Sequence, residues 1–240
     1  MHGAARLCYN RPMSLTALPE PVLLLREALR RPLPGLQAQV RMAPEPRHGV
    51  DESANPDQEY RPAAVLVLIY PCGHGPRQAS PEPGNQTTVS LEDLCLVLTL
   101  RTERVENHRG QISFLGGSMD PGEDATATAL REAEEELGVD PHSMQILGSL
   151  SPLTIPHSRF CVWPVVAYAA QRPAFVPNGE EVAEVIQVEI AQLLAPSTRC
   201  EEVWQLHGGP VRVPYYAVGP HKVWGATAMM LGELLAVLLG

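Results

Sequence analysis

Residues 117–139 read GSMDPGEDATATALREAEEELGV, and this stretch decides the fold. At about 100° per residue, the glutamates Glu132, Glu135 and Glu136 fall within an arc of roughly 100° on a helix. Like charges three or four residues apart on a helix cost about 0.2–0.5 kcal/mol per pair. A chain that keeps three of them together therefore indicates a bound cation, and oxygen ligands favour a hard divalent ion, Mg²⁺ or Mn²⁺.

The ends of this helix are also readable from the sequence. Pro121 and Gly122 predict a turn before it, and Glu123 and Asp124 lie where the positive end of the helix dipole favours acidic groups. Gly138 is placed to end the helix in a left-handed conformation. An apolar arc beside the acidic one predicts a buried side, made of Leu130, Ala133 and Leu137.

The spacing of these residues resembles the signature of the Nudix family, the Nudix box. The fixed positions of that box are filled by Gly117, Glu123, Arg131-Glu132-Ala133, Glu135-Glu136 and Gly138-Val139. The resemblance implies an α/β fold, a Nudix-type α/β/α sandwich with a mixed sheet, and an enzyme that cleaves a nucleoside diphosphate linked to another moiety. The alternatives are an acidic surface helix with fortuitous spacing and a non-catalytic relative that retains the box.

The resemblance also implies roles for the acidic residues. Glu132 and Glu136 are expected to hold Mg²⁺ or Mn²⁺, and further candidate ligands are Glu135, Glu123 and the carbonyl of Gly117. Arg131 is expected to fix a carboxylate by a bidentate hydrogen bond rather than touch the substrate. The general base stays open between Glu132 or Glu135 on the helix and, on a later loop, Glu180, Glu181 or Glu184.

A second motif lies upstream of the box. Residues 98–104 read LTLRTER and residues 108–117 read HRGQISFLGG, which is similar to the stretch that marks coenzyme A pyrophosphatases within the family. Thr102 stands where serine is usual and Leu115 where proline is usual, and the latter change relaxes the turn that enters the box. The candidate substrate-binding residues are Arg101, Thr102, His108, Gln111 and Gly116.

Two downstream segments agree with the same subfamily. Residues 177–185 read PNGEEVAEV and residues 223–228 read VWGATA, which resemble its Asn-x-x-Glu-Val and Trp-Gly-x-Thr-Ala elements. The resemblance implies hydrolysis of coenzyme A to adenosine 3′,5′-bisphosphate and 4′-phosphopantetheine. The alternatives are a pyrophosphatase for ADP-ribose, NADH or another nucleoside diphosphate derivative, and a nucleotide-sensing module without turnover.

The composition limits the classes of protein to which the chain can belong. With 240 residues and 45% hydrophobic residues, the chain is long enough for one main globular domain. Its formal charge of −9 argues against general nucleic-acid binding. Positive charge for a small diphosphate substrate must therefore be local, and Arg101, Arg104, Arg109 and Lys222 are candidates. A homodimer is expected only from the resemblance to the family, since no feature of the sequence indicates one.

Cysteines and hydropathy suggest a compartment. The five cysteines are widely spaced without a Cys-x-x-Cys pair, so reduced thiols are expected, with Cys95 and Cys161 as small core residues. No stretch reaches about 18 uninterrupted apolar residues, and the first 14 residues lack a signal-peptide core. We expect a soluble, cytoplasmic protein without membrane contact. An amphipathic presequence is the alternative, with Met13 as an alternative start.

The order of elements divides the chain into an extension, residues 1–59, and a Nudix domain, residues 60–240. The extension is expected to hold one helix, at 19–31, and a proline-rich linker. Strands are predicted at 63–70, 94–101, 143–150, 161–170, 184–188 and 211–217. A long excursion is expected at 71–92, a short helical turn at 190–194, and an amphipathic terminal helix at 225–239 whose methionines, Met229 and Met230, fill the core.

Overall fold

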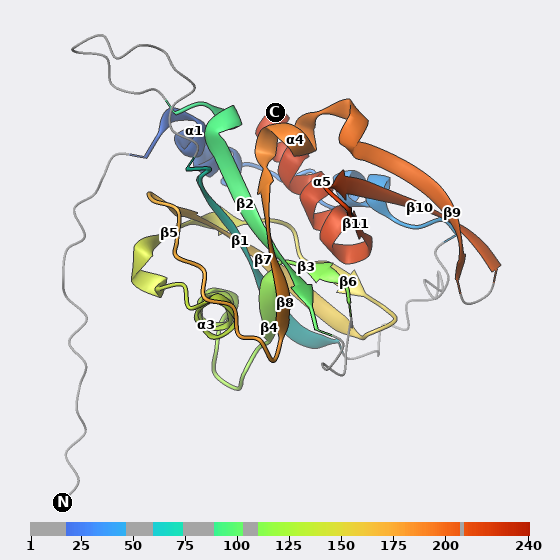
Figure 1. Cartoon of the computed structure of the whole chain (residues 1–240), viewed down its shortest axis with the longest axis horizontal. Helices are drawn as coiled ribbons and strands as arrows, with labels where there is room; N and C mark the ends of the chain where they lie inside the picture. Colours follow the sequence, from blue (N-terminus) through green and yellow to red (C-terminus); the bar gives the residue numbers. More distant parts are fainter. Residues whose placement is uncertain (1–17, 47–59, 74–88, 103–109, 207–208) are drawn as a thin grey trace, which may run out of the picture.

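A mixed sheet between two layers of helices forms the body of the molecule (Figure 1). The structure is a computed structural model and describes residues 18–46, 60–73, 89–102, 110–206 and 209–240. Helix α3 covers one face of the sheet, and α1 and α5 cover the other. The predicted α/β/α sandwich with a mixed sheet is therefore confirmed.

The sheet is organised around β1 (Arg61–Pro71), which runs parallel to β7 (Phe160–Ala169) and antiparallel to β2 (Leu94–Arg101) and β4 (Leu115–Ser118). Strand β1 is buried on both faces, which explains its nearly continuous apolar sequence. Both β5 (Met144–Ser149) and β6 (Leu153–Ile155) pair with β7, whereas β3 (Ile112–Ser113) and β8 (Val182–Glu189) pair with β2. Five of the six predicted strands lie in this sheet, and β2 has the predicted ends, whereas the short strands β3, β4 and β6 were not predicted.

Helix α3 (Ala125–Leu137) begins and ends where the sequence predicts. The Asp124 carboxylate caps it by accepting a hydrogen bond of 2.8 Å from the backbone N–H of Ala127. Gly138 ends it in the left-handed conformation, with φ of 65°. Ala129, Ala133 and Leu137 are buried against the sheet. This packing sets which side of the helix carries the acidic groups.

The opposite face is covered by α5 (Gly225–Leu239), α1 (Glu20–Ala28) and the short α2 (Leu36–Gln39). The expectation of an amphipathic α5 was wrong. The helix is buried on most of its circumference because the sheet, the N-terminal helices and a second sheet all pack around it. Met229 and Met230 are buried, as predicted. Residues 18–43 supply α2 in addition to the one predicted helix, and both helices contact α5.

A second, three-stranded sheet lies beside α5 and has the order β11-β10-β9 (Figure 1). Its strands are β9 (Arg199–Leu206), β10 (Gly209–Val218) and β11 (His221–Trp224). Only β10 was predicted. Strand β9 is polar and largely exposed, so its sequence lacks the apolar signal of a buried strand. The chain enters this sheet through α4 (Ile190–Leu194), the predicted helical turn. Short 3₁₀ turns complete the elements at Val40–Met42, Leu91–Asp93, Pro141–Ser143 and Pro196–Thr198.

The cysteines depart from expectation. Cys72 and Cys95 form a disulfide, with their Cα atoms 5.0 Å apart. The pairing of β1 with β2 places Pro71 opposite Leu94, so the two cysteines meet although 23 positions separate them in sequence. Of the free thiols within the described ranges, Cys161 is partly exposed rather than a core residue, and Cys200 is also partly exposed.

Several expectations fall on other parts of the chain. His108, Arg104, Arg109, Cys8 and Met13 lie outside the described residues, as do most of the predicted linker and of the excursion at 71–92. Among the helices of the described residues, none has the length and apolar character needed to cross a membrane.

Candidate active site

The last two turns of α3 present their carboxylates to a glycine pair on β4. Strand β4 pairs with β1 so that Gly117 lies opposite Ala64. A Cβ atom on Gly117 would lie 2.3 Å from Oε1 of Glu132, and one on Gly116 would lie 2.3 Å from the carbonyl oxygen of Ala64. Gly116 is therefore required by a close contact with the backbone of a neighbouring strand, whereas a side chain at position 117 would displace the carboxylate of Glu132.

Arg131 lies at the centre of the acidic group. Its guanidinium forms a two-pronged contact with Glu123, at 2.8 and 3.1 Å, and donates to Glu132 at 2.8 Å and to Glu135 at 2.9 Å. It also donates to the backbone carbonyl of Ser118 at 3.2 Å. One cation thus holds three carboxylates in fixed positions, which is the kind of contact the sequence suggested for Arg131.

Glu123 is locked from a second direction by Thr128, a residue that the sequence did not single out. The hydroxyl of Thr128 is buried with its side chain and donates to Glu123 at 2.7 Å. Arg131 first, then Thr128 and the backbone N–H of Asp120, hold the pKa of Glu123 low, at about 2. The only sequence feature that could have indicated Thr128 is its position on the buried side of the helix, about one turn after Glu123.

Glu136 is the most enclosed carboxylate of the site, with 1% of its surface exposed. Its Oε1 faces Arg101 at 3.3 Å, while its Oε2 is buried without a hydrogen-bond partner. Burial raises the pKa of Glu136 to about 8, because desolvation outweighs the attraction of Arg101 and nearby carboxylates add repulsion. Burial also raises the pKa of Glu132. The carboxylates of Glu132 and Glu136 therefore lie where too little positive charge is present to balance both of them.

A tight turn at residues 178–181 closes the site from the side of β8. The backbone N–H of Asn178 donates to the carbonyl of Glu136 at 2.8 Å, and its side-chain oxygen accepts from Glu180 N–H at 3.1 Å. Thr102 then ties the turn to β2, through its N–H to the carbonyl of Glu181 and its hydroxyl to that of Glu180. Asn178 was not among the predicted site residues, although its motif was recognised.

These contacts carry Glu181 into the acidic group. Its carboxylate lies 3.9 Å from the guanidinium of Arg101, and its negative charge helps raise the pKa of both Glu132 and Glu136. The side chain of Glu181 is 42% exposed, in contrast to 2% for Glu136. Of the three loop glutamates considered from sequence, Glu181 is thus placed both at the site and open to solvent.

Other predicted residues take different places. Gln111 accepts a backbone hydrogen bond from Arg101 at 3.0 Å, which brings it to the end of β2, and the N–H of Gly116 donates to the Glu136 carboxylate. Glu184 instead pairs with His221 at 3.1 Å, and Lys222 pairs with Glu202 at 2.6 Å in the second sheet. Lys222 and Glu184 thus each have an ion-pair partner outside the acidic group of α3.

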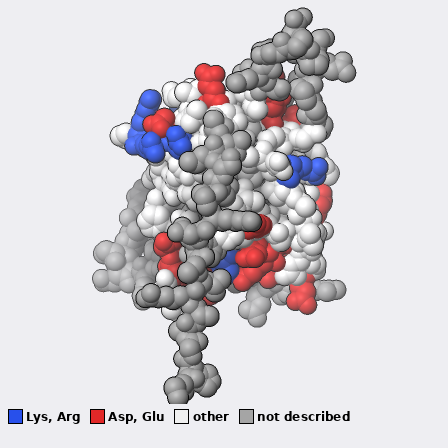
Figure 2. Space-filling view, turned by 90° about the vertical axis from the view of Figure 1, so that its left-hand side faces the viewer, with Lys and Arg blue, Asp and Glu red and all other residues white. Residues whose placement is uncertain are grey.

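The acidic residues offer the oxygen ligands that a divalent cation prefers, but their side chains do not converge on a preformed coordination site. Five carboxylates share two guanidinium groups, and the buried Oε2 of Glu136 lacks a partner. Such oxygens are the ligands that Mg²⁺ and Mn²⁺ prefer. Within the described ranges, however, no three acidic, histidine or cysteine side chains converge as a closed metal-binding group. Figure 2 shows acidic side chains gathered around a small basic patch in the lower part of one face.

Comparison with known proteins agrees with this site. The model of the NUDIX domain matches residues 87–206. Nudix hydrolase 3 of Caenorhabditis elegans is 31% identical over 70% of this chain and 80% of its own length. The Nudix hydrolase NudL of Pectobacterium atrosepticum is 34% identical over 76% of this chain and 85% of its own length, and is named as uncharacterized. The mitochondrial coenzyme A diphosphatase NUDT8 of Mus musculus is 36% identical over 62% of this chain and 76% of its own length.

The fold, the box helix and these matches define a hydrolase of diphosphate bonds. The chain belongs to the Nudix family.

Proposed function

We propose that this protein hydrolyses the diphosphate bond of coenzyme A or its derivatives, giving adenosine 3′,5′-bisphosphate and 4′-phosphopantetheine. The observation that carries the proposal is that three subfamily motifs, far apart in sequence, meet in space. Thr102 bonds to the turn at residues 178–181, and the hydroxyl of Thr227 donates to the carbonyl of Ile112 at 2.9 Å. Similarity to a coenzyme A diphosphatase supports the same substrate.

The carboxylates of α3 would hold the metal ions of the reaction. We assign this role to Glu132 and Glu136, with Glu123, Glu135 and the carbonyl of Gly117 as further ligands. When bound, Mg²⁺ or Mn²⁺ would offset the charge of the diphosphate and acidify the attacking water. Arg131 would position the carboxylates, because its five donors are engaged by Glu123, Glu132, Glu135 and Ser118.

We assign the general base to Glu181. It lies beside Arg101 and its carboxylate is open to solvent, so it can accept a proton from water at the edge of the site. Glu132 and Glu135 are engaged by Arg131 and are the alternatives. The turn anchored by Asn178 and Thr102 would fix the position of Glu181 relative to the carboxylates of α3.

Product analysis with a panel of diphosphates tests the proposed substrate. The full chain is incubated with coenzyme A, ADP-ribose, NADH and a dinucleoside polyphosphate, each with defined Mg²⁺ or Mn²⁺. We expect the highest kcat/KM for coenzyme A, with the two products named above. A higher kcat/KM for another substrate would assign the protein to a different branch of the family. Absence of turnover on the whole panel would favour a nucleotide-binding module.

A further inference from the structure

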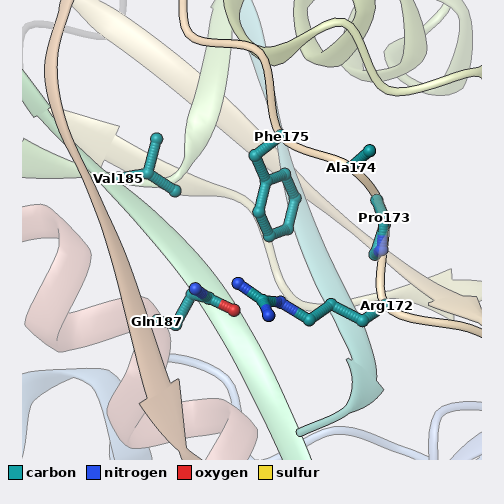
Figure 3. A pocket seen from close by; sticks show the side chains of 6 residues that line it. All are labelled: Arg172, Pro173, Ala174, Phe175, Val185 and Gln187. Carbon is teal, nitrogen blue, oxygen red and sulfur yellow. The ribbon is translucent and has the colours of Figure 1, made fainter. Parts of the chain in front are cut away.

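A second pocket lies beside the turn at residues 178–181 (Figure 3). It is a depression of about 500 Å³ that is open to solvent, and it is lined by Arg172, Pro173, Ala174, Phe175, Val185 and Gln187. We propose that this pocket binds a small molecule in which a phosphate group is joined to a planar ring system, as in a mononucleotide. The proposal concerns a site distinct from the acidic residues of α3.

The pocket and the acidic residues are separated by a fixed segment of chain. One wall comes from residues 172–175 and the other from β8, and the chain between these walls folds over the end of α3. There, the N–H of Val176 donates to the carbonyl of Leu137 and that of Asn178 to Glu136, both at 2.8 Å. Val182, which follows the turn, is buried. No residue that lines the pocket belongs to the acidic group.

Arg172 gives the pocket its affinity for an anion. It is the only ionisable residue among the six that line the pocket, and the described residues offer it no ion pair. Tyr70 donates to the side-chain oxygen of Gln187 at 3.2 Å, which holds the amide in place. Figure 3 shows that this oxygen, and not the amide nitrogen, lies on the side of Arg172. The guanidinium of Arg172 is therefore the group that would bind a phosphate.

The remaining walls suit a planar ring. Phe175 is held in place by an edge-to-face contact with Tyr70, with ring centroids 5.5 Å apart and planes at 66°. Val185, Ala174 and Pro173 add apolar surface around it. Because the ring of Phe175 is already held in place, a nucleotide base could stack on it without first ordering the side chain. A volume of 500 Å³ lies within the range of about 300–1,000 Å³ that small-molecule sites span.

Calorimetric titration of the full chain with 5′-AMP in EDTA tests the proposal, since EDTA keeps divalent ions from the acidic residues. We expect saturable binding of one AMP. Arg172→Ala should weaken it at least about tenfold by removing the phosphate contact, and Phe175→Leu about fivefold by removing the stacking surface. Adenosine and ribose 5-phosphate, which each lack one of the two groups, should bind at least about tenfold more weakly.

Arg30→Ala is the matched control, because Arg30 is an exposed arginine in the turn after α1, and it should bind AMP as the wild type does. The thermal midpoint of each variant is measured to verify folding. Absence of saturable AMP binding by the wild type would overturn the proposal. Binding that survives Arg172→Ala but is lost in Arg101→Ala would overturn it as well, since AMP would then occupy the acidic site. Hydrolysis by Arg172→Ala is measured separately, so the proposed enzymatic function can fail without this site failing.

Discussion

Two buried glutamates, one on each side of the sheet, differ in how their carboxylates are satisfied. Glu233 on α5 is fully buried, and Glu136 on α3 is 1% exposed. Glu233 accepts from the backbone N–H groups of Gly35 and Ser151, at 3.1 and 3.2 Å, and from the side chain of Gln39 at 2.8 Å. Glu136 has the guanidinium of Arg101 and the backbone N–H of Gly116 as donors, and one of its oxygens has no partner.

The difference separates a structural acid from a functional one. Uncharged donors from three residues satisfy Glu233, so its carboxylate joins α5 to α2 and to the chain after β5. Glu136 is enclosed next to other carboxylates, an arrangement that disfavours its charge unless a cation is added. Burial alone therefore does not indicate the role of a carboxylate, whereas the hydrogen bonds that the carboxylate accepts do indicate it.

Removal of the charge of Glu136 should have the largest effect on activity. We expect Glu136→Gln to lower kcat by about a thousandfold, roughly 4 kcal/mol in the barrier, because Glu136 is a proposed metal ligand. Steady-state rates with saturating Mg²⁺ or Mn²⁺ measure this loss. Glu134→Gln is the control, since Glu134 lies on the exposed side of the same helix. Normal turnover by Glu136→Gln would remove Glu136 from the metal site.

Truncation of Glu233 should act on stability instead. Glu233→Ala leaves two backbone N–H groups and the Gln39 amide without their acceptor, so we expect the free energy of unfolding to fall by about 3 kcal/mol. Denaturant titration gives this value, and kcat of the folded variant should change less than twofold. Leu239→Ala, at an exposed position of the same helix, should leave stability unchanged. A large loss of kcat in folded Glu233→Ala would contradict the structural assignment.

Substitution of Glu181, the exposed glutamate that contacts Arg101 together with Glu136, should reduce activity but not stability. Glu181→Gln should lower kcat by about a hundredfold, the contribution typical of a general base, without changing stability. Steady-state rates with saturating Mg²⁺ or Mn²⁺ and the thermal midpoint measure the two effects. The neighbour Glu180 contacts Thr102 through its backbone only, so Glu180→Gln is the control. A Glu181→Gln variant with unchanged kcat would move the base to Glu132 or Glu135.

What the sequence predicted correctly was local or periodic. The ends of α3, the glycines at its entry and the five longer strands of the main sheet follow from spacing and apolar pattern, whereas the short strands β3, β4 and β6 were not predicted. Contacts between distant segments were not predictable, because they depend on how strands and loops are placed in space. The network of Glu233, the disulfide of Cys72 and Cys95, and the pocket at Arg172 all belong to this second kind.

The Glu136 site also predicts how stability depends on pH without metal. Its pKa is near 8 in the folded protein and near 4.5 when unfolded, so the folded state binds the extra proton. The stabilisation is complete below the unfolded pKa and is lost as pH rises toward 8. In EDTA, wild type should therefore lose about 3–4 kcal/mol relative to Glu136→Gln between about pH 5 and 8. Denaturant titrations at both pH values measure this difference, and Glu134→Gln should follow the wild type. Equal pH dependence in wild type and Glu136→Gln would show that Arg101 fully compensates the buried charge.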